Sequence, residues 1–158
     1  KRDIICLMPT NIYGINDNFN PFSGHVIPGM ITKFINAKKK NKNVELLGTG
    51  KPLREFLYVD DLAEAIFLTL NLSKNKIKKV FKSKFPLMNV GTGENISIKK
   101  LAFLIKKMIN FKGKIKFNSS YPDGTYKKNL NSNKIAQLGW KPKITLKDGL
   151  EKVILSRY

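Results

Sequence analysis

The chain contains 158 residues, of which 42% are hydrophobic, so it is long enough to bury a sizeable core. Its net charge is +19, but only three of its 30 basic residues are arginines, and the lysines are scattered over most of the sequence. Aromatic and basic residues do not interleave as they do where bases stack, so we expect a solvated basic surface and no nucleic-acid partner. No apolar run approaches the roughly 20 residues of a membrane span, so no membrane association is expected.

The single cysteine and the single histidine exclude two further classes of protein. Cys6 cannot build a disulfide framework, and a chain without one fits a reducing compartment, so a cytoplasmic location is expected. One cysteine and one histidine also offer no spacing that is typical of a metal site, so no metal is expected.

The first predicted element is a strand over Ile4–Met8, whose unbroken apolar run is typical of a parallel strand covered on both faces. Such a strand needs neighbours and none precedes it, so we expect the chain to be the later part of a larger α/β unit. A polar loop over Ile15–Gly24 then leads to a predicted helix over His25–Lys39, with Pro28 in its first turn. His25 therefore stands at a helix entrance, beside the sheet edge where open α/β sheets bind ligands. A polar capping residue is the alternative interpretation of His25.

The stretch Leu47–Phe67 begins with a glycine-rich turn followed by an arginine. Gly48 and Gly50 allow a ligand to approach the backbone closely. Arg54 carries a fork of donors that suits a phosphate or a carboxylate. A hairpin without a ligand is the simpler interpretation of each feature alone, and their combination favours a phosphate-handling turn.

A helix is predicted directly after this turn. Asp60 or Asp61 is expected to cap it by accepting from the free N–H groups of its first turn. Leu62, Ile66 and Leu70 recur at helical spacing, so we expect them to form its core-facing side.

The remainder of the chain predicts short strands and helices that alternate. Gly91-Thr92-Gly93 lacks the third glycine of a dinucleotide fingerprint, so alone it is weak evidence for a cofactor loop. Thr145 begins a capping box with Asp148. The other expected elements are a surface linker over Asn71–Phe85, strands over Leu87–Val90 and Lys114–Asn118, a helix from Ser97 and a short helix over Asn131–Leu138.

Several motifs together resemble the extended short-chain dehydrogenase/reductases that act on nucleotide sugars. The three stretches that carry this resemblance are Met8–Gly14, Arg54–Asp61 and Asn89–Gly93. Two further signatures are similar to those of the GDP-L-fucose synthase family: Asp17–Asn20 followed by Gly24–Gly29, and Tyr121–Thr125. The resemblance runs over essentially the whole chain. It implies an α/β fold, the C-terminal part of a Rossmann-type enzyme, with the last parallel-sheet strands and a small mixed α/β substrate-binding lobe.

The resemblance also implies an activity and a set of site residues. That family converts GDP-4-keto-6-deoxy-D-mannose to GDP-L-fucose, by epimerising two carbons and then reducing the keto group with NADPH. His25 matches the family's catalytic acid/base histidine, whose partner cysteine cannot be Cys6 because Cys6 lies within the strand before the motif. The NADP(H)-binding residues implied by the resemblance are Pro9, Thr10, Asn11, Ile12 and His25. The implied substrate-binding residues are Lys33, Arg54, Asp123 and Leu47, the last standing where relatives often carry tryptophan.

By the same resemblance, residues 1–158 form the C-terminal substrate-binding part of an NAD(P)-dependent epimerase/dehydratase domain. The glycine-rich cofactor loop and the Ser, Tyr and Lys needed for the reduction are expected before Lys1, so the N-terminal half is expected to be absent and the chain alone inactive. The complete enzyme is expected to be a homodimer. Two alternatives stay open: a related nucleotide-sugar epimerase or dehydratase that uses another nucleotide, and a non-catalytic basic binding module.

Overall fold

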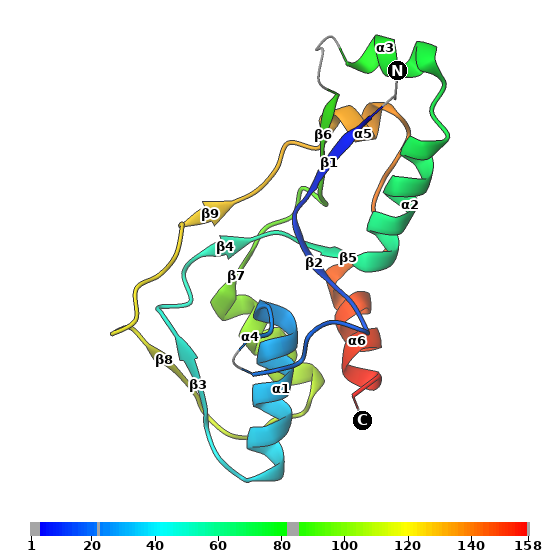
Figure 1. Cartoon of the computed structure of the whole chain (residues 1–158). Coiled ribbons are helices and arrows are strands. Elements are labelled where there is room, and N and C mark those ends of the chain that lie inside the picture. Colours follow the sequence, from blue (N-terminus) through cyan, green and yellow to red (C-terminus); the bar gives the residue numbers. More distant parts are fainter. Residues whose placement is uncertain (1–3, 22, 82–85, 158) are drawn as a thin grey trace.

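The computed structural model describes residues 4–21, 23–81 and 86–157 (Figure 1). Its strands and helices alternate along the chain, as expected for the α/β class. The strands are β1 (Cys6–Pro9), β2 (Asn11–Tyr13), β3 (Val44–Leu47), β4 (Leu53–Arg54), β5 (Phe56–Tyr58), β6 (Leu87–Val90), β7 (Ile96–Ser97), β8 (Ile115–Asn118) and β9 (Lys127–Lys128). The helices are α1 (Val26–Lys39), α2 (Val59–Leu70), α3 (Lys74–Val80), α4 (Ile98–Met108), α5 (Asn133–Gln137) and α6 (Leu146–Leu155).

Parallel pairs dominate the sheet structure of the described residues. β1 pairs with β6, β2 with β5 and β3 with β8, each in parallel, while β4 lies between antiparallel β7 and parallel β9. β1 and β2 are consecutive but pair with different strands, so the chain passes from one small sheet to the next between Pro9 and Asn11. Figure 1 shows β1, β6, α2, α3 and α5 at one end of the molecule, and α1, α4 and α6 at the other.

Two hydrophobic clusters form the interior, and β5 joins them. The larger cluster gathers side chains of α1, α4 and α6, and the smaller one gathers side chains around β6, α2 and α5. Phe56 and Tyr58 belong to the larger cluster, whereas Leu57 between them belongs to the smaller one. Successive side chains of a strand point to opposite faces, so a fully buried strand of three residues can supply both clusters.

Asp61 connects α2 to a distant part of the chain instead of capping its own helix. Its side chain is buried, and its carboxylate accepts from the N–H groups of Lys143 (2.9 Å) and Ile144 (3.0 Å). The N-cap of α2 is Tyr58, whose side chain makes no capping hydrogen bond. The expected cap at Asp60 or Asp61 is therefore wrong, because both residues lie inside the first turn and Asp61 binds amides that precede α6.

Two apolar surfaces are more exposed than the sequence predicts. The buried residues of α2 are Asp61, Ala65 and Thr69, whereas Ile66 is 43% exposed and Leu70 is 79% exposed. The prediction that Ile66 and Leu70 belong to the core-facing side of α2 is therefore wrong. The first strand was expected to be covered on both faces and without a neighbour. It pairs with β6, and Met8 on it is 50% exposed.

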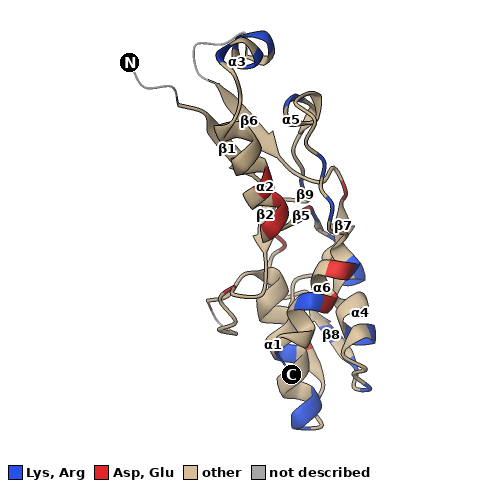
Figure 2. Ribbon diagram, turned by 90° about the vertical axis from the view of Figure 1, so that its right-hand side faces the viewer, with Lys and Arg blue, Asp and Glu red and all other residues tan. Residues whose placement is uncertain are grey.

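Other expected elements differ less. The predicted N-cap at Thr145 is confirmed, since its hydroxyl accepts from the N–H of Asp148; the Asp148 carboxylate accepts from this hydroxyl and not from the main-chain N–H that a capping box uses. The expected linker over Asn71–Phe85 contains α3, whose N-cap Ser73 accepts from the N–H of Lys76; residues 82–85 lie outside the described residues. Lysine and arginine are distributed over α1, α3, α4 and α6 in Figure 2. Within the described part of the chain, no helix is both long and apolar enough to cross a bilayer.

Replacing Asp61 tests how strongly this carboxylate holds α2 to the segment that precedes α6. We expect Asp61→Asn to lower the free energy of unfolding by about 2–3 kcal/mol, because the NH₂ group of the buried amide would then face one of the two N–H groups that the carboxylate accepts from. Asp60→Asn is the matched control, since Asp60 is exposed, and its effect should stay within about 0.5 kcal/mol. Urea unfolding followed through Trp140 measures both variants. Equal stabilities of the two variants would contradict the assignment.

Candidate functional site

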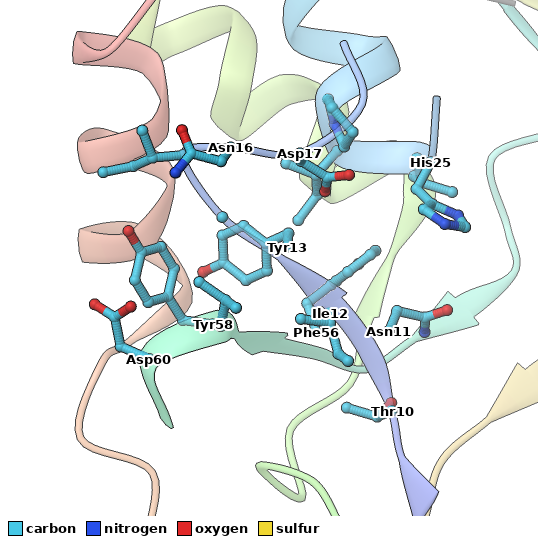
Figure 3. A pocket seen from close by; sticks show the side chains of 16 residues that line it. Thr10, Asn11, Ile12, Tyr13, Asn16, Asp17, His25, Phe56, Tyr58 and Asp60 are labelled. Atoms are coloured by element: carbon cyan, nitrogen blue, oxygen red, sulfur yellow. The ribbon is translucent and has the colours of Figure 1, made fainter. Parts of the chain in front are cut away.

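The first candidate cavity opens where the chain leaves β1. It has a volume of about 750 Å³, and its wall includes Thr10, Asn11, Ile12, Tyr58 and His25. Figure 3 shows His25 and Asn11 on one side of this cavity and Tyr58 on the opposite side. We call it the β2 pocket, because β2 supplies its central wall.

Thr10 and Asn11 are held by one acceptor on the neighbouring strand segment. The Thr10 hydroxyl (3.0 Å) and the Asn11 side-chain N–H (2.7 Å) both donate to the main-chain carbonyl of Glu55. These bonds fix the two polar side chains relative to β5. Of the residues expected to bind the cofactor, Thr10, Asn11, Ile12 and His25 line the β2 pocket, whereas Pro9 is not among its lining residues.

Two tyrosines contribute to the β2 pocket from β2 and β5. The rings of Tyr13 and Tyr58 pack edge to face, with centroids 5.4 Å apart. Burial raises the pKa of Tyr13 above its ordinary value, with Tyr58 and the carboxylates of Asp61 and Asp148 adding to the effect. Burial, and then the charge of Asp60, raises the pKa of Tyr58. Both hydroxyls are therefore protonated at neutral pH, so they are hydrogen-bond donors and not bases.

The second candidate cavity lies between the start of α1 and the turn after β3. It has a volume of about 350 Å³ and is lined by residues from four separate stretches of the chain. We call it the Arg54 pocket. The predicted substrate-binding residues Lys33, Leu47, Arg54 and Asp123 all line it.

His25 belongs to both cavities. It is exposed, lines the β2 pocket and the Arg54 pocket, and occupies the N-cap position of α1 with an extended backbone. Its side chain makes no capping hydrogen bond, while its main-chain carbonyl accepts from the N–H of Gly29 (2.9 Å). The capping interpretation therefore holds for the backbone of His25 only, and the residue is shared by the linings of the two pockets.

The guanidinium of Arg54 is oriented by two main-chain carbonyls. Its Nη1 donates to the carbonyls of Leu53 (2.8 Å) and Thr125 (2.7 Å). Its Nη2 lies beside Gly124, where a Cβ would come within 3.4 Å of it. Arg54 is half-buried, so its orientation is fixed before any ligand binds.

Asp123 closes the glycine-rich turn after β3. Its carboxylate accepts from the N–H of Thr49 (2.9 Å) and from the Thr49 hydroxyl. Gly48 has φ +80°, and a Cβ there would lie 2.4 Å from an oxygen of Asp123, so only glycine fits this close approach. The structure thus gives Asp123 a partner within the chain. Leu47, which precedes this turn, is 56% exposed at the edge of the pocket.

Sequence reasoning missed Glu55, which stands in the chain between Arg54 of one lining and Phe56 of the other. Its side chain is fully buried, and its carboxylate accepts from the N–H groups of Gly93 (2.8 Å) and Leu130 (3.0 Å). A signal was present, since Glu55 is an acidic residue among apolar neighbours in a chain with 11 acidic residues. Because its N–H donates to Glu55, Gly93 is not free to bind a phosphate, which agrees with the weak fingerprint of Gly91-Thr92-Gly93.

Known proteins resemble the chain over nearly all of its length. The profile of the NAD dependent epimerase/dehydratase family matches residues 1–82, which is more than half of the chain. The chain belongs to the NAD dependent epimerase/dehydratase family. It is 43% identical over 151 residues to GDP-L-fucose synthase 1 of Arabidopsis thaliana, an alignment that covers 95% of this chain and 44% of that protein.

Solved structures of this epimerase/dehydratase type have the same fold. A GDP-L-fucose synthetase from Naegleria fowleri bound to NADP superposes with a TM-score of 0.83 at 29% identity, over 96% of this chain and 46% of that one. A GDP-6-OMe-4-keto-L-xylo-heptose reductase from C. jejuni superposes with a TM-score of 0.84 at 36% identity, over 94% of this chain and 52% of that one. The chain thus spans about half the length of the proteins it matches, and the expected α/β class of a Rossmann-type enzyme is confirmed.

The Asp123 contact predicts a pH dependence for the turn that it closes. The hydrogen bonds from Thr49 hold the pKa of Asp123 below its usual value of 3.8, with Lys51 and Arg54 contributing. A lowered pKa means that the contact stabilises the fold above pH 3.8 and is lost as the pH falls through the lower, folded-state value.

This dependence can be followed at the Thr49 amide by NMR from about pH 6 to about pH 2. We expect the Thr49 amide signal to titrate with a midpoint below 3.8, and Asp123→Asn to abolish that titration. A midpoint at or above 3.8 in the unmodified chain would show that the carboxylate is not held by Thr49.

Proposed function

We propose that residues 1–158 form the substrate-binding part of a nucleotide-sugar epimerase/reductase, which converts GDP-4-keto-6-deoxy-D-mannose to GDP-L-fucose with NADPH. One observation carries the proposal: His25 stands where the β2 pocket meets the Arg54 pocket. A reaction in which a sugar first exchanges protons and then accepts a hydride needs a proton-transfer group between its substrate and its cofactor. The GDP-L-fucose synthases among the relatives support this activity.

The Arg54 pocket suits the nucleotide diphosphate of such a substrate. Arg54 offers a planar set of donors that can bind two phosphate oxygens at once, and Lys33 adds a point charge from α1. Leu47 supplies an apolar edge. Asp123 is proposed to contact the substrate through the turn that it holds, with its carboxylate already engaged by Thr49.

The β2 pocket suits the nicotinamide end of NADP(H). Ile12 gives it an apolar wall, and the fixed amide of Asn11 gives it a polar group at a defined position. When bound there, the cofactor would supply the hydride for the keto group. The Gly91–Gly93 loop does not fit the pyrophosphate, because the Gly93 N–H is bonded to Glu55. We propose that a separate N-terminal cofactor-binding half holds the rest of the cofactor.

His25 is proposed to move protons at the carbons beside the keto group. A carbonyl acidifies the neighbouring C–H bonds, because the electron pair left behind spreads onto the carbonyl oxygen. Imidazole can take up and return such a proton near neutral pH. The second acid/base group of the family is a cysteine, and Cys6 lies on β1 outside the linings of both pockets.

Another GDP-sugar is the second candidate substrate. The observation that favours it is the C. jejuni reductase, which matches the fold as well as the fucose synthetase does and has the higher identity. That protein's name specifies a GDP-linked heptose, so both candidates share the guanosine diphosphate. For either substrate we propose a cytoplasmic location, on the basis of cysteine content, and a homodimeric complete enzyme.

Nucleotide binding by this chain tests the proposal without requiring turnover. We expect GDP to bind more tightly than UDP or dTDP in calorimetric titrations, and Arg54→Ala to weaken GDP at least about tenfold through loss of a charged hydrogen-bonding group. The matched control is Arg157→Ala, because Arg157 lies over the ring of Phe19 and lines neither pocket. Tighter binding of UDP than of GDP, or an equal loss of GDP affinity in both arginine variants, would refute the substrate assignment.

A further inference from the structure

Glu55 is a buried charged side chain that none of the proposed binding steps uses. It is fully buried, directly follows Arg54 and precedes β5. A buried carboxylate is strongly unfavourable unless both of its oxygens have partners. A buried acid at this position of the chain, between a residue of each pocket, needs a physical reason.

The carboxylate joins two loops that come from distant parts of the chain. One oxygen accepts from the N–H of Gly93 at 2.8 Å, and the other from the N–H of Leu130 at 3.0 Å. A Cβ at Gly91 would lie 2.2 Å from a Glu55 oxygen, so the backbone of the Gly91–Gly93 loop wraps directly around the carboxylate. Glu55 is thus enclosed, with little room to change its conformation.

The Leu130 bond also secures the segment that orients Arg54. In the parallel pairing of β4 with β9, Arg54 stands opposite Lys128. After this strand, the N–H of Leu130 donates to the carboxylate of Glu55. Before it, the carbonyl of Thr125 accepts from the guanidinium of Arg54. The chain from Thr125 to Leu130 is therefore fastened on both sides of its strand by consecutive residues, Arg54 and Glu55.

The main chain of Glu55 acts on the other pocket. Its carbonyl accepts from the side chains of Thr10 and Asn11, both of which line the β2 pocket. One peptide segment therefore places a guanidinium in the Arg54 pocket and orients two polar side chains in the β2 pocket. Any rotation of this segment moves the polar groups of both pockets together.

We propose that Glu55 is a positioning residue, whose buried carboxylate fixes the backbone at residues 54–55 and thereby sets Arg54 and Asn11 relative to each other. In its functional consequence this inference rests on the proposed nucleotide-sugar function. A substrate held by Arg54 then presents its sugar at a constant distance from the groups beside Asn11 and His25. The two pockets behave as one site because a single residue orients both.

The test uses Glu55→Gln in the full chain. Glutamine keeps the shape but offers one acceptor oxygen, so its NH₂ group opposes either the Gly93 or the Leu130 amide. We expect GDP affinity to fall about tenfold or more. In the absence of nucleotide, we expect shifts of the Arg54 Nε–H signal in one pocket and the Asn11 side-chain amide signal in the other.

Two controls separate positioning from loss of stability. Ile109→Val removes a methylene from a buried residue that lines neither pocket, so it should lower the melting temperature but leave GDP affinity and both side-chain signals unchanged. Glu151→Gln changes an exposed acid on α6 and should alter neither the GDP affinity nor the two side-chain signals. If Glu55→Gln shifts only the Gly93 and Leu130 amides and binds GDP as tightly as the unmodified chain, the positioning role is wrong.

A second variant covers the case in which Glu55→Gln does not fold. Thr10 is half-buried and lines the β2 pocket, and Thr10→Val removes the hydroxyl that donates to the Glu55 carbonyl. We expect it to shift the Arg54 Nε–H signal, although Thr10 and Arg54 line different pockets. An unchanged Arg54 signal would overturn the inference. Failure of the unmodified chain to bind GDP would instead overturn the proposed function, while the signals still test the positioning role.

Discussion

The segment from Arg54 to Tyr58, which is buried from Glu55 onward, links the two hydrophobic clusters to both pockets. Alternation along β5 sends Phe56 and Tyr58 into the larger cluster and Leu57 into the smaller one, so three residues join the two halves of the interior. The preceding residue, Glu55, binds two loops through its carboxylate. The same segment contributes to both pockets, with Arg54 in one lining and Phe56 and Tyr58 in the other.

The start of α1 provides the complementary side of the site. Its first residues pack into the larger cluster, with Ile27 and Ile31 buried, which fixes the position of the preceding N-cap residue. His25 therefore lines both pockets. Its backbone caps the helix, whereas its imidazole makes no capping hydrogen bond. An imidazole that lines the same pocket as an oriented guanidinium is the arrangement that the proposed proton exchange on a bound nucleotide sugar needs.

Local signals in the sequence predicted the elements whose cause is local, and failed where the cause is distant. Helical periodicity predicted α1, and the spacing of Thr145 and Asp148 predicted the cap of α6. The expectation for Asp61 was wrong because its partners lie over 80 residues away, where no local pattern reports them. Motif resemblance supplied Lys33, Arg54 and Asp123, which the fold brings to one cavity. Glu55 was missed because its importance comes from burial, which only the packed structure reveals.

We propose that the two pockets form one nucleotide-sugar site on the Arg54–Tyr58 segment, and NMR mapping of GDP added to the chain tests this. We expect the largest shifts on Lys33, Arg54 and Gly124, with a smaller shift of the His25 imidazole, which lines both pockets. Shifts concentrated on the lysines of α3, with these pocket signals unchanged, would contradict it and would indicate non-specific binding to the basic surface.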